Sequence, residues 1–253
     1  MSASHPDLLD VDALIGRHPE RDVGDGSVSD LVAEMDRVGI GAAVVSHTAS
    51  WLHDPVTGNR WILDEASKSP RLHPCWVMLP DTCGEIAGPA DFVRAADDSG
   101  VVAVRAYPAA HGYDLAGPDA APLLDALADA GLPLLVDAAQ ADLRAIETVA
   151  GLRPRLSVVV CNPGYRSLRR QAGALSRHPN ISLDLANLVT HGGLEWLVKH
   201  FGPGRLVFGT GGPEHDPAEA VTRLLLSELD DDEVCAIGHG NARVLLGERL
   251  GRP

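Results

Sequence analysis

The stretch LPLLVDAAQADLRAIETVAGLRPRLSVVVC, residues 132–161, decides the fold class of this chain. It opens and closes with short runs of Leu and Val that hardly alternate with polar residues, as strands buried on both faces of a parallel sheet should. Between these runs, residues 141–151 carry apolar side chains three and four apart and end at Gly151, which predicts a helix. The stretch therefore predicts a strand, a helix and a second, parallel strand.

The same alternation extends over the whole chain. Eight apolar runs recur at fairly even spacing: LLDVDALI from residue 8, AAVVS from 42, HPCWVML from 73, VVAVRAY from 101, LPLLVDA from 132, LSVVVC from 156, ISLDLA from 181 and RLVFGT from 205. Helical patterns separate them; one of these runs from a capping-box-like Ser27 and Asp30 to Gly39 as its final cap. The others end at Gly100, Gly131, Gly151 and Gly202, and more helical sequence follows the eighth run.

Eight strands, each followed by helical sequence and without a long linker, predict a closed (β/α)₈ TIM barrel that spans residues 1–253 as a single α/β domain. A doubly wound sheet is the alternative. Both architectures bind ligands at the carboxyl ends of their strands, so the residues that leave each run are the candidates for function.

Composition excludes several classes of partner. The formal charge of −14 is spread along the chain, which disfavours nucleic acid. We also expect no membrane partner, because no window approaches a spanning length of apolar residues and the first residues lack the pattern of a secretion signal. The four cysteines form no C-x-x-C pair and three have apolar neighbours, which predicts reduced thiols and a cytoplasmic location.

Polar and charged residues stand where the apolar runs end. Three aspartates there would be costly to bury without partners, and two arginines are the candidates to compensate them. Because a guanidinium suits a carboxylate, the arginines predict a small anionic ligand. The residues at or just after the ends of the runs are Asp12, Leu14, His47, Leu79, Asp81, Arg105, Tyr107, Asp137, Gln140, Asn162, Tyr165, Arg166, Asp184, Asn187, Thr210, Glu214, His215 and Asp216.

Known nucleotide and hydrolase motifs are missing from the sequence. Neither SGVVAV nor GTGG has the spacing of a dinucleotide or phosphate loop, and no G-x-S-x-G element is present. Asp216-Pro217 reads as the cap and first residue of a helix. The loop histidines His47, His111, His191 and His215 lack the short spacing of a metal-binding pair.

The chain resembles the amidohydrolase-related family of metal-dependent barrels, in its branch with aminocarboxymuconate-semialdehyde decarboxylase and pyrone-dicarboxylate lactonase. The resemblance covers nearly the whole chain, through LLDVDALIG (8–16), LVAEMDRVGIGAAVV (31–45), VVAVRAYP (101–108), RLVFGTGGPEHDP (205–217) and IGHGNARVLLG (237–247). It implies a barrel with its ligand at the strand ends, and together with exposed apolar helix positions it is consistent with a homodimer.

The departures from the family pattern concern its metal. The resemblance places the family's ligands on two histidines of strand one, one histidine each of strands five and six, and an aspartate of strand eight. The corresponding residues here are Asp12, Leu14, Asp137, Asn162 and Gly211. Leucine and glycine offer no ligand atom, and an asparagine amide is a poor substitute for imidazole. We expect no metal and no other cofactor.

These features predict a metal-independent, amidohydrolase-like enzyme that acts on a small carboxylate-bearing carbonyl compound. The reaction would be hydrolysis of a lactone-like or amide-like bond, or a decarboxylase or other lyase step. Asp137 is the first choice as general acid or base, because burial at a strand end raises its pKa, and His215 and Asn162 complete the predicted catalytic set. The predicted substrate-binding residues are Arg105, Arg166, Tyr165, Tyr107, Asp12, Asp184, His47 and Glu214.

Two alternatives remain open at this point. One is a non-catalytic binding or scaffold protein with the same barrel, in which the ligand positions were lost together with the chemistry. The other is a metal-dependent hydrolase whose ligands have moved to the four loop histidines, which would require several new ligands at matched distances.

Overall fold

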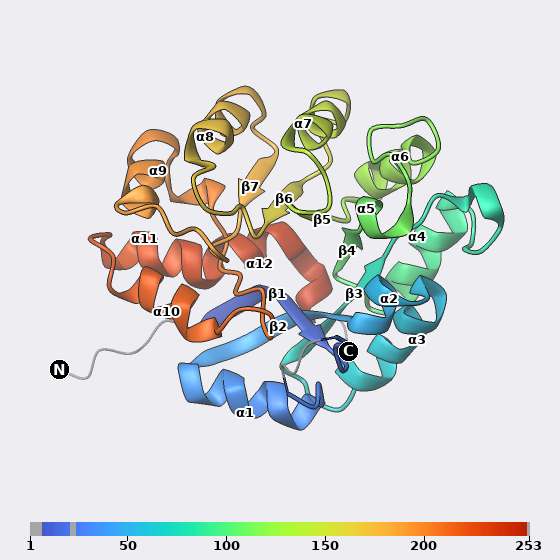
Figure 1. Cartoon of the computed structure of the whole chain (residues 1–253), viewed down its shortest axis with the longest axis horizontal. Helices are drawn as coiled ribbons and strands as arrows, with labels where there is room; N and C mark the ends of the chain where they lie inside the picture. Colours follow the sequence, from blue (N-terminus) through green and yellow to red (C-terminus); the bar gives the residue numbers. More distant parts are fainter. Residues whose placement is uncertain (1–6, 21–23, 252–253) are drawn as a thin grey trace.

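The structure is a computed structural model that describes residues 7–20 and 24–251. Parallel strands and helices alternate around a barrel (Figure 1). Seven strands pair in sequence order, β1 next to β2 and so on to β7, and every pair is parallel. Their bounds are Leu8–Ile15 (β1), Ile40–His47 (β2), Leu72–Val77 (β3), Ala103–Ala106 (β4), Leu134–Asp137 (β5), Val158–Cys161 (β6) and Ile181–Leu183 (β7).

The eighth apolar run closes the barrel, although it does not form a regular strand. Isolated bridges join it to β7 at Leu183 and Leu206 and to β1 at Ala13 and Gly212. The Asp10 carboxylate accepts hydrogen bonds from the backbone N–H and the hydroxyl of Thr210, over 3.0 and 2.6 Å, and so takes a place in the ladder that a backbone carbonyl would fill. This side-chain contact explains why the expected strand is replaced by a closing segment, residues 206–212.

Helices cover the outside of the barrel. Their bounds are Val28–Val38 (α1), Thr48–Leu52 (α2), Pro55–Ala66 (α3), Pro89–Asp98 (α4), Pro108–His111 (α5), Ala121–Ala130 (α6), Leu143–Leu152 (α7), Leu168–Arg177 (α8), Gly193–Phe201 (α9), Pro217–Leu225 (α10), Asp231–Cys235 (α11) and Asn241–Leu246 (α12). A π-helical turn, Ala236–Gly240, joins α11 to α12. No helix within the described residues is long and apolar enough to cross a membrane.

Most predicted helix ends are confirmed. Ser27 accepts from the backbone of Asp30 at the start of α1, and Gly39 ends this helix with φ 82°. Asp216 caps α10 and Pro217 is its first residue, as expected. The prediction for α7 is wrong by one residue, because this helix passes through Gly151 and ends at Leu152.

Two apolar layers position the functional end of the barrel. The larger layer lies between the strands and the surrounding helices, and the smaller one fills the barrel. In the smaller layer, Ala242 and Leu246 of α12 belong to the same cluster as Leu9 and Val102, near the starts of β1 and β4. This end is therefore closed by α12, which leaves the carboxyl ends of the strands to carry the site. Only two cysteines, Cys75 and Cys161, are buried, rather than the three expected.

Candidate active site

A buried ion pair between β1 and β4 lies at the centre of the strand ends. Nη2 of Arg105 donates to Oδ1 of Asp12 over 2.5 Å, and both side chains are only 4% exposed. Nη1 of Arg105 donates to the Tyr107 hydroxyl over 3.4 Å. Burial alone would lower the pKa of Arg105, but the carboxylate of Asp12 raises it well above its usual value, so the guanidinium is a fixed positive charge.

A second polar pair consists of Asp137, the last residue of β5, and Asn162, the first residue after β6. Nδ2 of Asn162 donates to Oδ2 of Asp137 over 3.4 Å, and Oδ1 of Asp137 accepts from the backbone of Ala139 over 2.6 Å. Burial raises the pKa of Asp137, the negative charge of Asp12 raises it further, and Arg105 opposes both. Because both side chains of the pair remain partly exposed, a ligand can reach them from the barrel mouth.

Asp184, at the end of β7, lies deeper than the sequence predicts. Its Oδ1 accepts from the backbone N–H groups of Asn162 and Ala186, over 2.9 and 3.2 Å. The residue is 0% exposed, and burial raises the pKa of its carboxyl well above the usual value. Asp184 therefore holds the loop of Asn162 from below the mouth, and its contact with substrate stays a prediction.

An aromatic wall stands on the β2 and β4 side of these residues. The rings of Trp51 and Tyr107 stack with centroids 5.3 Å apart, and His18 meets Trp51 edge-on at 5.9 Å. Nε2 of His18 lies 3.8 Å from Oε1 of Glu214, so the wall extends to the loop after the closing segment. Sequence reasoning missed Trp51 and His18; the position of Trp51 in the first turns after β2 was the available signal.

His47, a predicted substrate-binding residue, makes its contacts with α2 and α3. Its Nδ1 accepts from the backbone of Ala49 over 3.0 Å and so caps α2. Its ring packs edge-on against Trp61 of α3, with centroids 5.3 Å apart. The last residue of β2 therefore points into the helix layer, because its neighbour Ser46 takes the buried position.

The β6–α8 loop carries Tyr165 and Arg166 on the surface. Tyr165 is 62% exposed, and the guanidinium carbon of Arg166 lies 4.9 Å from the centre of its ring. Arg166 follows Asn162 by four residues on the same loop, and both adopt positive φ, 61° and 49°. The loop therefore begins at the half-buried Asn162 and carries the exposed Arg166 four residues later.

His215 lies against Gly211 of the closing segment. A Cβ added to Gly211 would lie 2.8 Å from Cδ2 of His215, and the glycine has φ +67°. An aspartate, the residue that the resemblance expects at this position, would be strained there and would collide with the imidazole ring. His215 has therefore taken the space beside this position.

The residues at the family's metal-ligand positions do not fit a metal centre of that kind. Asp12 is bound by a guanidinium, Leu14 and Gly211 have no ligand atom, and Asp137 is hydrogen-bonded to Asn162. Within residues 7–20 and 24–251, one group of three or more potential ligands comes together, and it consists of Asp12, Cys161 and Asp184. The four loop histidines are not brought together in this part of the chain, which argues against relocated histidine ligands.

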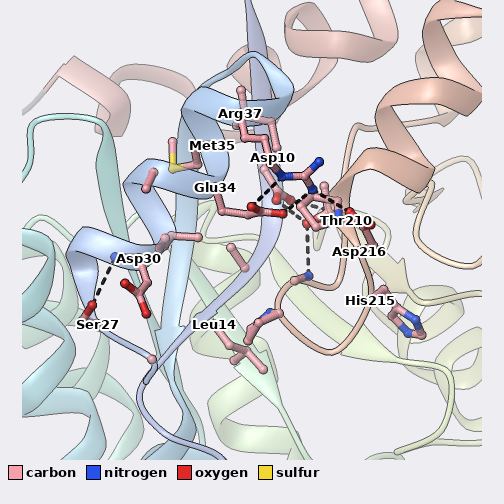
Figure 2. Close-up of a pocket in the computed structure, with 18 residues that line it drawn as sticks. Asp10, Leu14, Ser27, Asp30, Glu34, Met35, Arg37, Thr210, His215 and Asp216 are labelled. Atoms are coloured by element: carbon pink, nitrogen blue, oxygen red, sulfur yellow. Dashed lines mark hydrogen bonds and ion pairs between the residues drawn. The ribbon is translucent and has the colours of Figure 1, made fainter. Parts of the chain in front are cut away.

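A cavity of about 690 Å³ lies beside the mouth, between α1 and the loop that leads to α10 (Figure 2). The ion pairs of Arg37 with Glu34 and Asp216 span it. Its walls also include Leu14, Met35 and His215. Its lining does not include Arg105, Asp137 or Asn162, so it is separate from the polar cluster at the strand ends.

Unsatisfied polar atoms distinguish the strand ends from this cavity. Nε of Arg105, Oδ1 of Asn162 and Oδ2 of Asp184 are buried, and each lacks a hydrogen-bond partner among the described residues. Of the described residues that line the cavity, none has such an atom. Because unpaired buried polar groups are rare and costly, we place the candidate active site at the strand ends.

Several solved structures share this fold. An uncharacterized TIM-barrel protein from Bordetella bronchiseptica is 20% identical, with a TM-score of 0.76, over 97% of this chain and 99% of that one. A putative 2-pyrone-4,6-dicarboxylic acid hydrolase from Pseudomonas putida is 18% identical, with a TM-score of 0.69, over 96% and 98%. A dihydroxybenzoic acid decarboxylase from Polaromonas, solved with bound manganese and an inhibitor, is 14% identical, with a TM-score of 0.74, over 98% of each chain.

The sequence comparisons agree with this fold. No curated protein matches the chain. The model of a protein family described as amidohydrolase matches residues 5–247. This match covers nearly the whole barrel, from the N-terminal side of β1 to the end of α12, and the chain therefore belongs to the amidohydrolase family.

Proposed function

We propose that this protein is an enzyme that acts on a small carboxylate-bearing carbonyl compound without a bound metal. The observation that carries the proposal is the hydrogen-bonded pair of Asp137 and Asn162, half-buried at the mouth beside the buried guanidinium of Arg105. A carboxyl group whose pKa is raised by burial, and which is held in place by an amide, is a stronger base than an ordinary aspartate and can accept and return a proton.

Each residue of the site has a separate task in this proposal. In hydrolysis, Asp137 takes a proton from water as the water attacks the carbonyl carbon, and it returns the proton to the leaving group. In a decarboxylation, the same carboxyl group delivers the proton to carbon. The fixed charge of Arg105 favours the negative charge that develops on the substrate in either reaction. Both reactions use these same groups, and we take hydrolysis, in which Asp137 acts first as a base, as the working proposal.

Arg166 is the proposed anchor for the substrate carboxylate. Its guanidinium is exposed on the loop that also carries Asn162, and the planar fork suits a carboxylate. Arg105 is less suited to direct binding, because Asp12 already holds one of its nitrogens. Tyr165 supports Arg166 through the contact of its ring. Glu214 lies on the loop after the closing segment, where it pairs with His18 of the aromatic wall, and His215 follows it in the chain.

Support for a metal-free reaction comes from the donor set. The amidohydrolase neighbours include a decarboxylase with manganese, and we propose that this chain differs because its corresponding positions cannot supply such a centre. The positive charge that a metal would provide is instead supplied by Arg105, which is 4% exposed.

The test is a screen of small lactones, amides and aromatic acids that bear a carboxylate, with product analysis by mass spectrometry. Turnover that disappears in Asp137→Asn supports the proposal, and the product mass separates hydrolysis from decarboxylation. The buried state of Arg105, Asp12 and Asp184 favours one other function, a binding protein without chemistry. Thermal stabilisation by a screened acid without any product would favour that alternative.

A further inference from the structure

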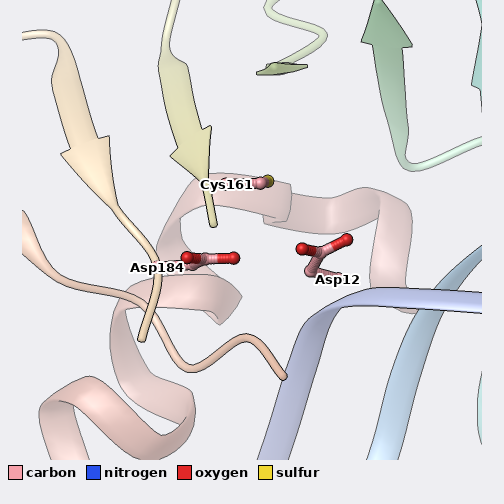
Figure 3. Close-up of side chains that lie close together, drawn as sticks. All are labelled: Asp12, Cys161 and Asp184. Carbon is pink, nitrogen blue, oxygen red and sulfur yellow. The ribbon is translucent and has the colours of Figure 1, made fainter. Parts of the chain in front are cut away.

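Asp12, Cys161 and Asp184 enclose a small space inside the barrel. One ligand atom from each residue lies within 4.8 Å of the others, and all three residues are buried. Figure 3 shows the two carboxylates facing each other from β1 and the end of β7, with Cys161 of β6 on one side. One thiol and two carboxyl groups are a ligand set that zinc and cobalt accept, with water as a fourth ligand.

Asp184 supplies an independent sign that this space is suited to a cation. Its Oδ1 is saturated by two backbone N–H groups, whereas Oδ2 receives no hydrogen bond from the described residues. The side chain is fully buried and faces the carboxyl group of Asp12. Burial, charge repulsion from Asp12 and a hydrogen bond with Asp12 all raise the pKa of Asp184, and a cation between the two groups would relieve that repulsion.

The guanidinium of Arg105 already reaches this space. Its Nη2 lies 2.5 Å from Oδ1 of Asp12 and 4.0 Å from Sγ of Cys161. A second cation placed among the same groups would be repelled by this charge at short range and in a poorly screened interior. The space among these three groups therefore already holds one positive charge, that of Arg105.

We infer that Asp12, Cys161 and Asp184 form a latent metal site whose resident cation is the side chain of Arg105. Removal of the guanidinium would open the site to one divalent ion such as Co²⁺ or Zn²⁺. The ligand atoms would need to draw together to roughly 3–4 Å, the spacing that metal–ligand bonds of about 2.0–2.3 Å impose. The Cys161 thiol and the Asp184 carboxyl group, whose pKa burial raises well above the usual value, would each release a proton to solvent as the metal binds.

The experiment compares Co²⁺ binding to the wild-type chain and to Arg105→Ala, prepared without chelators and without an affinity tag. We expect Arg105→Ala to retain one cobalt ion per chain after dialysis and to show a thiolate-to-cobalt charge-transfer band in the near ultraviolet. We expect the wild type to retain none. Arg105→Lys keeps a positive charge and should also exclude the ion, and Arg105→Ala with Cys161→Ala should lose the charge-transfer band.

Folding is controlled by a second variant and a second measurement. Removing Arg105 leaves the Asp12 charge unpaired, so Arg105→Gln, whose amide can still donate to Asp12, is tested alongside. If neither variant folds without metal, the inference predicts that Co²⁺ or Zn²⁺ restores the native circular dichroism spectrum. Folded variants that retain no cobalt, or variants that remain unfolded with metal, would overturn the inference.

The latent metal site is a claim separate from the proposed function, and different results would contradict each of them. Tight native metal in the wild-type chain would contradict the metal-free reaction. Cobalt in the wild type with the same charge-transfer band would show that Arg105 does not guard the site. A metal-free but catalytically active wild type whose Arg105 variants ignore cobalt would remove the latent site and leave the proposed enzyme intact.

Discussion

Nη2 of Arg105 lies 2.5 Å from Oδ1 of Asp12 in the interior of the barrel, with both side chains 4% exposed. This contact links two strands that are far apart in sequence and gives the barrel a permanent internal cation. Asp12 occupies a position where the family resemblance places a metal ligand, and here it binds the guanidinium of Arg105 instead. The predictions below follow from this arrangement and from the Asp137–Asn162 pair above it.

Asp137→Asn should reduce kcat by roughly 10²–10⁴-fold, the usual contribution of a general acid or base, with little change in thermal stability. The amide has nearly the same shape but cannot accept the proton. Asp81→Asn is the matched control, because it makes the same chemical change at an exposed residue in the loop after β3. Steady-state kinetics of both variants provide the measurement, and equal activity in wild type and Asp137→Asn would remove Asp137 from the mechanism.

The pH profile should report the raised pKa of Asp137. Because the general base works as the carboxylate, kcat/KM should fall as pH drops through the folded-state pKa, at a midpoint above the ordinary range of aspartate near 4. Loss of the Asn162 hydrogen bond, which lowers this pKa, should move the midpoint upward. Asn162→Gly is the suitable variant, since glycine tolerates the φ of 49° at this position. A midpoint that does not move would show that Asn162 does not act on Asp137.

Arg166→Ala should raise KM and leave kcat nearly unchanged, as expected for an anchor that binds substrate and transition state equally. Arg166→Lys should recover only part of the affinity, because an ammonium group cannot make the paired contact of a guanidinium. Arg170→Ala is the control, an exposed arginine of α8 that pairs with Asp142. Should both alanine variants behave alike, the effect would come from general surface charge.

Asp10 should make the protein more stable at mildly acidic pH. Burial raises its pKa to about 6 from an ordinary 3.8, so the folded state binds a proton that the unfolded state releases. Unfolding free energy should therefore fall as pH rises through this range, by up to about 3 kcal/mol from this group. Asp10→Asn retains partners in Thr210 and should flatten that slope in urea unfolding between about pH 4 and 6, the interval between the two pKa values. An unchanged slope would assign the pH dependence to the other buried carboxyl groups.

Gly211→Ala should destabilise the fold more than Gly112→Ala. Both glycines have nearly equal positive φ, +67° and +68°, so both variants share the conformational cost of about 1–2 kcal/mol. Only the Cβ at residue 211 meets a neighbour, His215 Cδ2 at 2.8 Å, whereas that at residue 112 meets nothing within 4 Å. Thermal unfolding of the two variants measures the difference. Equal losses would mean that His215 moves aside without cost.

Much of the fold was predictable because local pattern and tertiary structure agree. Unbroken Val and Leu runs such as residues 156–161 indicated buried parallel strands, and Ser27, Gly39 and Asp216 gave correct helix ends. The closing segment was not predictable as an irregular strand, because its cause is the Asp10 side chain, which is 200 residues from Thr210 in sequence. Such a contact leaves no periodic signal.

The candidate site was predictable in composition but not in depth. The strand-end rule selected Asp12, Arg105, Asp137 and Asn162, which the structure brings to one end of the barrel. It could not show that His47 turns outward, because a one-residue difference in register decides the direction of a side chain. Cys161 was overlooked as the last residue of an apolar run, where it reads as core packing.

The most direct test of a metal-free mechanism is the metal content of the purified, catalytically active wild-type chain, measured by mass spectrometry against buffer blanks. We predict far less than one equivalent of zinc, manganese or iron per chain, with turnover retained. Near-stoichiometric metal that is lost together with activity on chelation would contradict the account, because Arg105 would then not be the cation on which the reaction depends.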